Sequence, residues 1–277
     1  MNQAPVEPIR THVAHAEWGV NRYFGFAVPD LLRREESLAG LLALAVRGRP
    51  LSLDEQRVVD DIAVAMTLAD PRVWPLKLAR LVSSYGRCLP GLAAGLLCLE
   101  EARIGPWTFG AAADLLQSLS EEAGEPTVAA MLAPVQRLLG GRRHLPGFLV
   151  PFRPRCERLQ LLREAVIARR RHELPWWAAM EAFIAAVRQL EGPEPNVGIG
   201  AAAACLDLGF TSREIAILAT GLAQTEFLSN AAEGSRQRAP VLQRLPDDRV
   251  RYVGAPPRMT PRAQVGAAKR RDELEKR

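Results

Sequence analysis

The sequence contains no long hydrophobic run. Across its 277 residues, no apolar stretch reaches the ~20 residues that a helix needs to span a bilayer. The opening residues also lack the charged start and apolar block of a secretory signal peptide. We therefore expect a cytoplasmic protein without a membrane partner.

Cysteine is scarce, and its spacing is irregular. A chain of this length does not need disulfides to fold, and the cysteines form no CxxC pair. We therefore expect buried, unpaired thiols at all four positions, which are Cys88, Cys98, Cys156 and Cys205.

Signatures of metal and nucleic-acid binding are missing as well. His12 and His15 lie three residues apart, but no further ligand accompanies them, so we expect no metal site. The formal charge is +5, and arginines concentrate in residues 142–171 and from Arg236 onward. Without zinc-finger spacing, a helix-turn-helix signature or aromatics between the basic residues, nucleic acid is the less favoured partner. A phosphate-bearing small molecule accounts for local arginines equally well.

Alternating patterns typical of strands are nearly absent, apart from short pieces near "WGVNRYFGFAV" and "RVRYVG". The other segments repeat their apolar residues at the helical period. One helix is predicted over residues 30–48, with Asp30 as its N-cap and Gly48 just past its end. A long helix is predicted over residues 211–234. The sequence therefore predicts an all-α protein with many short-looped helices.

Capping boxes mark the starts of two predicted helices. Ser52 is followed three residues later by Glu55, and Thr211 by Glu214. Two other predicted helices, residues 91–102 and 198–209, contain few bulky side chains. Small residues let helix backbones approach closely, so we expect these helices at the centre of the molecule or at a subunit interface. The tail from Ser235 is predicted to be an extended arm followed by a short charged helix.

The order of motifs along the chain resembles the citrate synthase family, in its short form shared with citryl-CoA lyases. "LPGFLVPFRPR" at 145–155 is similar to the family's "IPGFGHRVY…DPR", "PNVGIGAAAACLDLGF" at 195–210 to "PNVDFYSGLLLRALG", and "RYVGAPPRMTP" at 251–261 to "YVGP". The resemblance implies a homodimer of two-domain subunits. Residues 1–109 and 213–277 would form a large helical domain with a C-terminal arm. Residues 110–212 would form a small helical domain that closes over acyl-CoA.

The resemblance also implies a chemistry whose residues are replaced here. Family members join an acyl-CoA to an α-keto acid or run the related cleavage, with one histidine and one aspartate forming an enolate and a second histidine stabilising charge on the keto acid. The first histidine falls on Thr108 of "GPWTFG", the second on Val150 of "PGFLV", and the aspartate on Gly198 of "PNVG". Thr108 can still donate a hydrogen bond, but Val150 and Gly198 can neither donate nor accept a proton. We therefore expect no standard citrate synthase activity.

Three side chains remain as catalytic candidates: Thr108, Glu226 and His144. Glu226 lies on a helix that borders the active site in the family. If it is buried, its pKa would rise and it could serve as a replacement base; solvent exposure is the equal alternative. His144 is either a relocated acid or base or, as we favour, a solvated histidine in a basic loop.

The retained "PGF" turn points to coenzyme A. In the family this turn cradles the adenine and phosphates of CoA, and arginines surround it here. The predicted CoA-binding residues are Arg142, Arg143, Pro146, Gly147, Phe148 and Arg153. Arg155 matches a family arginine that holds a substrate carboxylate, and Asn196 belongs to the "PNV" motif, so both are predicted to bind substrate. We expect a CoA thioester as the substrate and no tightly bound cofactor.

Two classes of function follow. The first is a divergent acyl-CoA-dependent transferase or lyase that makes or breaks a C–C bond, acting on a CoA-bound or carrier-bound acyl thioester. The second is a non-catalytic pseudoenzyme that senses acyl-CoA or binds a protein. A pocket that holds Glu226 or His144 within reach of Thr108 would favour the enzyme. A pocket filled by Trp107, Phe109, Leu149 and Phe152 would favour the second class.

Overall fold

The computed structural model describes residues 9–100, 102, 104–141, 144–150 and 154–238, together with 246–249, 251, 253–254, 258, 260 and 263. The chain divides into two units, Met1–Arg238 and Ala239–Arg277. In the second unit, the 3-10 helix Asp247–Arg249 is described. Most of the predicted arm and nearly all of the charged helix lie outside the described residues.

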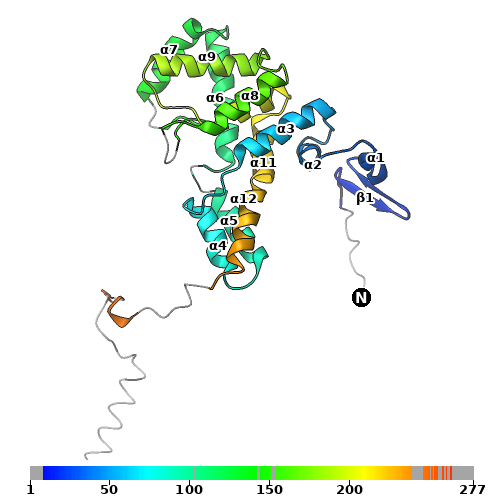
Figure 1. The fold of residues 1–277 in the computed structure, drawn as a ribbon, viewed down its shortest axis with the longest axis vertical. Helices are drawn as coiled ribbons and strands as arrows, with labels where there is room; N and C mark the ends of the chain where they lie inside the picture. The colour runs from blue at the N-terminus through cyan, green and yellow to red at the C-terminus, as the bar shows by residue number, and fades with distance from the viewer. Residues whose placement is uncertain are drawn as a thin grey trace, which may run out of the picture. The chain divides into compact units, whose positions relative to one another are not determined.

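Helices dominate the first unit, as predicted (Figure 1). They are α1 (Val28–Arg33), α2 (Leu38–Arg47), α3 (Leu53–Met66), α4 (Trp74–Ser83), α5 (Cys88–Glu100), α6 (Trp107–Ala123), α7 (Val128–Gly141), α8 (Glu157–Ala168), α9 (Pro175–Gln189), α10 (Val197–Asp207), α11 (Ser212–Leu222) and α12 (Gln224–Gly234). The all-α prediction is confirmed.

A small antiparallel sheet precedes the helices. Its strands are β1 (Ala14–Glu17), β2 (Val20–Tyr23) and β3 (Phe26–Ala27), in the order β1-β2-β3. Gly19 and Gly25 occupy the two tight turns with φ of 86° and 82°, a backbone conformation that glycine adopts without strain. The alternating pattern noted in this part of the sequence therefore marks real strands.

The predicted helix over residues 30–48 is wrong in its first half. Glu35 has a φ of 55°, and the chain separates into α1 and α2. The N-cap of α2 is Ser37, whose hydroxyl oxygen accepts a hydrogen bond from the Gly40 N–H at 3.0 Å. Asp30 lies in the first turn of α1 and is not its cap. Gly48 does end α2, with a φ of 69°.

The predicted helix over residues 211–234 is also two helices, α11 and α12, which meet at Ala223. The reason lies in their packing. Helix α11 packs against α6 and α2, whereas α12 packs against α4 and α5 (Figure 1). Both predicted capping boxes are confirmed, at Ser52 and at Thr211.

Helix α10 lies at the centre of the larger of two hydrophobic cores. Every residue from Val197 to Leu206 is buried. A side chain at Gly200 would lie 2.6 Å from Leu159 of α8, so the small residue lets the two helices approach closely. This confirms the central position predicted for residues 198–209.

The smaller core joins α4, α5 and α12. Its buried members in the described part of the chain are Leu76, Ala79, Leu99, Ala102 and Phe227. Gly95 of α5 permits this packing, because a Cβ there would lie 2.6 Å from the Phe227 ring and 2.7 Å from Ala79. The boundaries of the predicted domains, 110–212 and the remainder, stay a prediction.

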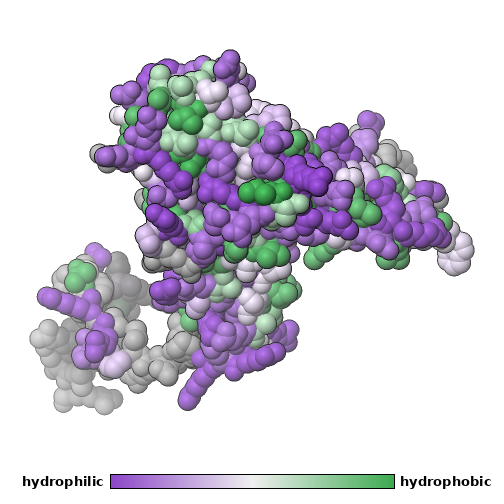
Figure 2. All heavy atoms as spheres, turned by 45° about the horizontal axis from the view of Figure 1, so that its top comes forward, coloured by the Kyte–Doolittle hydropathy of each residue, from purple (hydrophilic) through white to green (hydrophobic). Residues whose placement is uncertain are grey.

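Apolar groups reach the surface in separate patches on the face shown in Figure 2. No described helix is long and apolar enough to cross a membrane. All four cysteines are free. Burial is confirmed for Cys156 and Cys205 and is wrong for Cys88 and Cys98, which are partly exposed.

Candidate functional site

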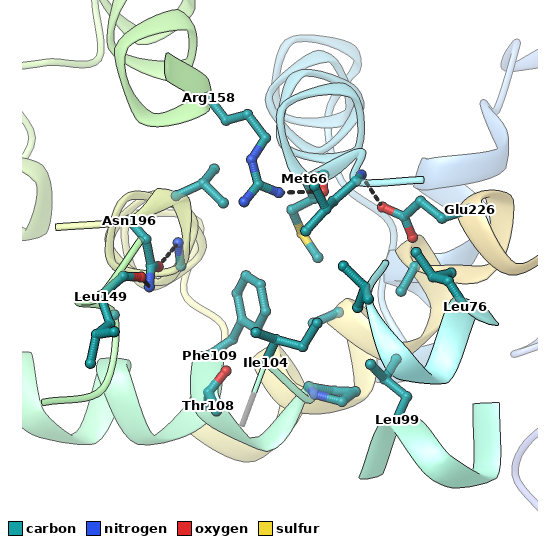
Figure 3. Close-up of a pocket in the computed structure, with 18 of the residues that line it drawn as sticks. Met66, Leu76, Leu99, Ile104, Thr108, Phe109, Leu149, Arg158, Asn196 and Glu226 are labelled. Atoms are coloured by element: carbon teal, nitrogen blue, oxygen red, sulfur yellow. Dashed lines mark hydrogen bonds between the residues drawn. The ribbon is translucent and has the colours of Figure 1, made fainter. Parts of the chain in front are cut away.

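A cavity of about 240 Å³ opens between the two hydrophobic cores (Figure 3). Its walls come from the ends of α3 and α4, from α5, α6, α8 and α10, from the junction of α11 with α12, and from the loop at 144–149. Five lining residues carry polar side chains: Thr108, His144, Arg158, Asn196 and Glu226. The others are apolar or glycine: Met66, Leu68, Val73, Leu76, Leu99, Ile104, Pro106, Phe109, Gly147, Phe148, Leu149, Val197, Gly198, Ala219, Ala223 and Phe227.

The "PGF" turn is held rigidly at one wall of this cavity. Pro146, Gly147 and Phe148 are buried. Gly147 has a φ of 79°, and a Cβ there would lie 2.7 Å from Ile199, so only glycine fits. The Phe148 ring packs edge-on against Phe183, with 5.1 Å between ring centroids. Backbone hydrogen bonds fasten the turn to residues 194–196, from Leu149 N to Glu194 O and from Asn196 N to Gly147 O.

The side-chain amide of Asn196 forms its hydrogen bonds within the protein. Its Nδ2 donates to the carbonyl oxygens of Phe148 and Leu149, at 3.0 and 2.9 Å. Its Oδ1 accepts from Gly198 N at 2.7 Å, which caps α10. The geometry therefore assigns Asn196 to holding the turn in place, and its predicted contact with substrate stays a prediction.

Thr108 lies in the first turn of α6 and lines the cavity. Its hydroxyl donates to the Gly105 carbonyl at 2.6 Å, so its proton is already used. Gly198 also lines the cavity, while Val150 is half-buried and packs against the larger core. At the three positions where the resemblance implies catalytic groups, the chain therefore has a hydrogen-bonded hydroxyl at Thr108, no side chain at Gly198 and a hydrocarbon side chain at Val150.

Glu226 is buried, so of the two alternatives left open by the sequence, burial is the one observed. Its Oε1 accepts a hydrogen bond from Leu68 N at 3.0 Å. Burial raises the pKa of this carboxyl to about 7, although the Leu68 bond and the nearby Arg158 charge favour the ionised form. A carboxyl with this pKa can accept or donate a proton near neutral pH.

Arg158 is the cavity residue that the sequence analysis missed. It lies on α8, and its Nη1 donates to the Met66 carbonyl at 3.0 Å. Its guanidinium has no other hydrogen bond within the described part of the chain. The sequence does contain a signal that could have identified Arg158. This residue lies one turn before the buried Leu162, so it borders the apolar face of its helix. The predicted Arg155 is exposed and lines a different hollow, beside Arg188 and Glu194.

His144 is half-buried at the wall formed by the loop. Glu226, His144 and Thr108 therefore share one cavity, which is open even though Phe109 and Leu149 line it. Trp107 lies outside the lining and is 42% exposed. Arg142, Arg143, Phe152 and Arg153 lie outside the described residues. Within the described residues, no cluster of His, Cys, Asp and Glu could hold a metal ion.

No protein-family model matches this chain, and no curated protein matches it in sequence. Solved structures do match. A citryl-CoA lyase from Hydrogenobacter thermophilus superimposes with a TM-score of 0.73 at 20% identity, over 93% of this chain and 99% of that one. An ATP citrate lyase from Methanosaeta concilii, in complex with (3S)-citryl-CoA, gives 0.67 at 18% identity, over 92% of this chain and 43% of that one.

A citrate synthase from Thermoplasma acidophilum, in a ternary complex with carboxymethyl coenzyme A and oxaloacetate, also matches. Its TM-score is 0.56 at 16% identity, over 83% of this chain and 60% of the other. These similarities extend over most of the present chain and agree with the order of motifs in its sequence. The chain has the citrate synthase-like fold.

Proposed function

We propose that this protein binds an acyl-CoA, or an acyl thioester on a carrier, in the cavity between its two cores, and acts on the acyl group with Glu226 as the proton-transfer residue. The observation that carries the proposal is that one cavity joins the intact "PGF" turn to a buried carboxyl with a pKa of about 7. Structural neighbours with CoA derivatives bound at this fold support the same ligand class.

The proposed chemistry uses Glu226 and Arg158 together. The proton on the α-carbon of a thioester is weakly acidic, so a base must act with a group that stabilises the enolate oxygen. Glu226 accepts the α-proton, and the electron pair of the broken C–H bond moves to the thioester oxygen. Arg158 then donates hydrogen bonds to that oxygen with its unused N–H groups. The carbanion-like carbon forms a bond to a carbonyl carbon, the π electron pair of that C=O bond moves to its oxygen, and this oxygen takes up the proton that Glu226 had accepted. The reverse sequence breaks the C–C bond.

This chemistry can be tested by isotope exchange. Incubation with an acyl-CoA in D₂O should replace the α-protons with deuterium, visible as a mass increase of the recovered thioester. Glu226→Gln should abolish the exchange and keep CoA binding, because the amide cannot accept the proton. The matched control is Glu121→Gln, an exposed glutamate on α6.

Turnover of the standard family substrates should be absent. Thr108, Val150 and Gly198 cannot supply the histidine and aspartate chemistry, so oxaloacetate should not stimulate thiol release from acetyl-CoA. Release above a heat-inactivated sample would contradict this part of the proposal.

The second candidate is a non-catalytic acyl-CoA sensor. The side chains of Thr108 and Asn196 favour this candidate, because they form hydrogen bonds to backbone groups of the protein and not to a reacting ligand. Tight binding of acyl-CoA without deuterium exchange in the wild type would select the sensor over the enzyme.

We also propose a homodimer. Leu89, Ala93 and Leu97 recur every fourth residue on the exposed face of α5, and the two leucines are 72% and 76% exposed. An outward apolar row of this kind is typical of a helix that packs against another subunit.

A further inference from the structure

We propose that the acyl group held in this cavity is a hydrocarbon of about six carbons, linear or carrying a ring, and not an acetyl or a carboxylated group. The inference rests on the proposed function, because it names the substrate class of the same site. It is carried by the cavity's size, the chemistry of its walls and the position of its charged groups.

The cavity is too large for an acetyl group alone. An apolar protein cavity of about 150 Å³ holds a benzene molecule. The cavity here measures about 240 Å³, so a two-carbon group would leave most of the space unfilled. Unfilled apolar space forfeits dispersion contacts on the surrounding side chains.

Apart from Glu226, the walls opposite the "PGF" turn are hydrocarbon. Figure 3 shows Leu149 and Asn196 on one side of the cavity and Leu76, Leu99 and Glu226 on the other. An acyl chain that enters from the turn therefore meets the smaller core, where Leu76, Leu99 and Phe227 line the cavity. Such walls bind methylene groups and offer nothing to a carboxylate.

In the lining that the described residues form, charged groups are too few for an acyl group with several carboxylates. Among the described residues, Arg158 is the one arginine or lysine that lines the cavity. Its positive charge already interacts with the Glu226 carboxyl. Arg155, predicted to hold a carboxylate, lines another hollow. A buried carboxylate without a cationic partner is strongly disfavoured, so a citryl-like group fits this cavity poorly.

Gly198 lies on the cavity wall at the position where the resemblance implies an aspartate. A Cβ added there would lie 2.8 Å from Asn196 Oδ1 and 3.8 Å from the Phe109 ring. Real Cβ atoms do not approach an oxygen this closely, so the position beside the Asn196 cap favours glycine, and no side chain projects from it toward Phe109. Ala223 is the small lining residue that we expect to set the accepted chain length.

Calorimetry with S-alkyl-CoA thioethers tests the proposal, because these analogues cannot be turned over. We expect affinity to rise from S-methyl-CoA to S-hexyl-CoA by about fourfold per methylene, equivalent to ~0.8 kcal/mol each, and to stop rising by S-dodecyl-CoA. S-carboxymethyl-CoA should bind more weakly than S-ethyl-CoA. Equal affinities for S-methyl- and S-hexyl-CoA, or tighter binding of the carboxymethyl analogue, would overturn it.

Variants distinguish the inference of a hydrocarbon acyl group from the proposed binding of acyl-CoA. Ala223→Leu narrows the cavity at the α11–α12 junction and should remove the preference for S-hexyl-CoA while unmodified CoA still binds. Ala129→Leu, at an exposed position of α7, is the matched control and should leave the preference intact. Binding of CoA without any chain-length preference refutes the hydrocarbon inference alone. No binding of CoA or any analogue at millimolar concentration refutes the proposed function as well.

Discussion

The carboxyl group of Glu226 lies where water solvates its charge poorly, and this has a consequence for folding. Its pKa is about 7 in the folded protein and near 4.5 in an exposed chain. Between these values the folded state holds a proton that the unfolded state has lost. The free energy of unfolding therefore falls as the pH rises from 4.5 through 7.

Replacing Glu226 with glutamine should remove this dependence. Relative to the wild type, Glu226→Gln should gain about 2–3 kcal/mol of stability between pH 5 and pH 8, as the pKa shift from 4.5 to about 7 requires. Urea unfolding of both proteins at the two pH values measures the difference, in which other titrating groups cancel. A constant difference across this range would mean that the carboxyl titrates normally.

For single residues, the sequence could identify candidates such as Glu226 but could not predict which other side chains or backbone groups they contact. Glu226 meets Leu68, and Arg158 meets Met66, across separations of 158 and 92 residues. No local pattern encodes such pairs, because they depend on how several helices pack. The resemblance led to Arg155, which precedes α8, whereas the guanidinium in the cavity belongs to Arg158 in the first turn of that helix.

Individual helices were predictable where the signal is local. Ser52 and Thr211 cap their helices through bonds within three residues, so the sequence is sufficient. The breaks at Glu35 and Ala223 were not predictable from periodicity. Apolar residues continue across Ala223, and at Glu35 the leucines on either side of the polar run 33–37 still fit the helical period. At Ala223 the choice is made by different packing partners on its two sides.

The glycines of α5 should be sensitive to substitution. A Cβ at Gly91 would overlap Ser83 Oγ and the Ala79 carbonyl oxygen of α4. Since the backbone of α4 has to move, we expect Gly91→Ala to cost about 1–3 kcal/mol in chemical denaturation. Gly140→Ala on α7 is the control: a Cβ there has no atom within 4 Å. It should be neutral or gain up to about 1 kcal/mol from helix propensity. Equal effects of the two variants would argue against close α4–α5 packing.

For the whole molecule, the order of motifs predicted the citrate synthase-like fold. A fold depends on many apolar positions together, so it can be predicted without predicting the chemistry of any one site. The cavity itself could not be predicted, because its volume is the difference between many packed surfaces.

The proposed homodimer can be tested by measuring the mass of the protein in solution. Light scattering at micromolar concentration should give twice the mass of 30.4 kDa, and Leu97→Glu should reduce it to one subunit by placing a charge in the apolar row of α5. Leu161→Glu, at a 57% exposed position on α8, is the control and should stay dimeric. A monomeric wild type would exclude the dimer.

The unequal sizes of the two cores imply a molecule that opens in stages. Few buried residues hold α4, α5 and α12 together, whereas the larger core draws on most other helices. Backbone amides in α4, α5 and α12 should therefore exchange with deuterium at a lower free energy of opening than those of α10. The cavity wall is shared by both cores, so a bound ligand should slow exchange in α4, α5 and α12 more than in α10. Hydrogen exchange measured with and without S-hexyl-CoA tests this; uniform exchange across all helices would show that the protein opens as one unit.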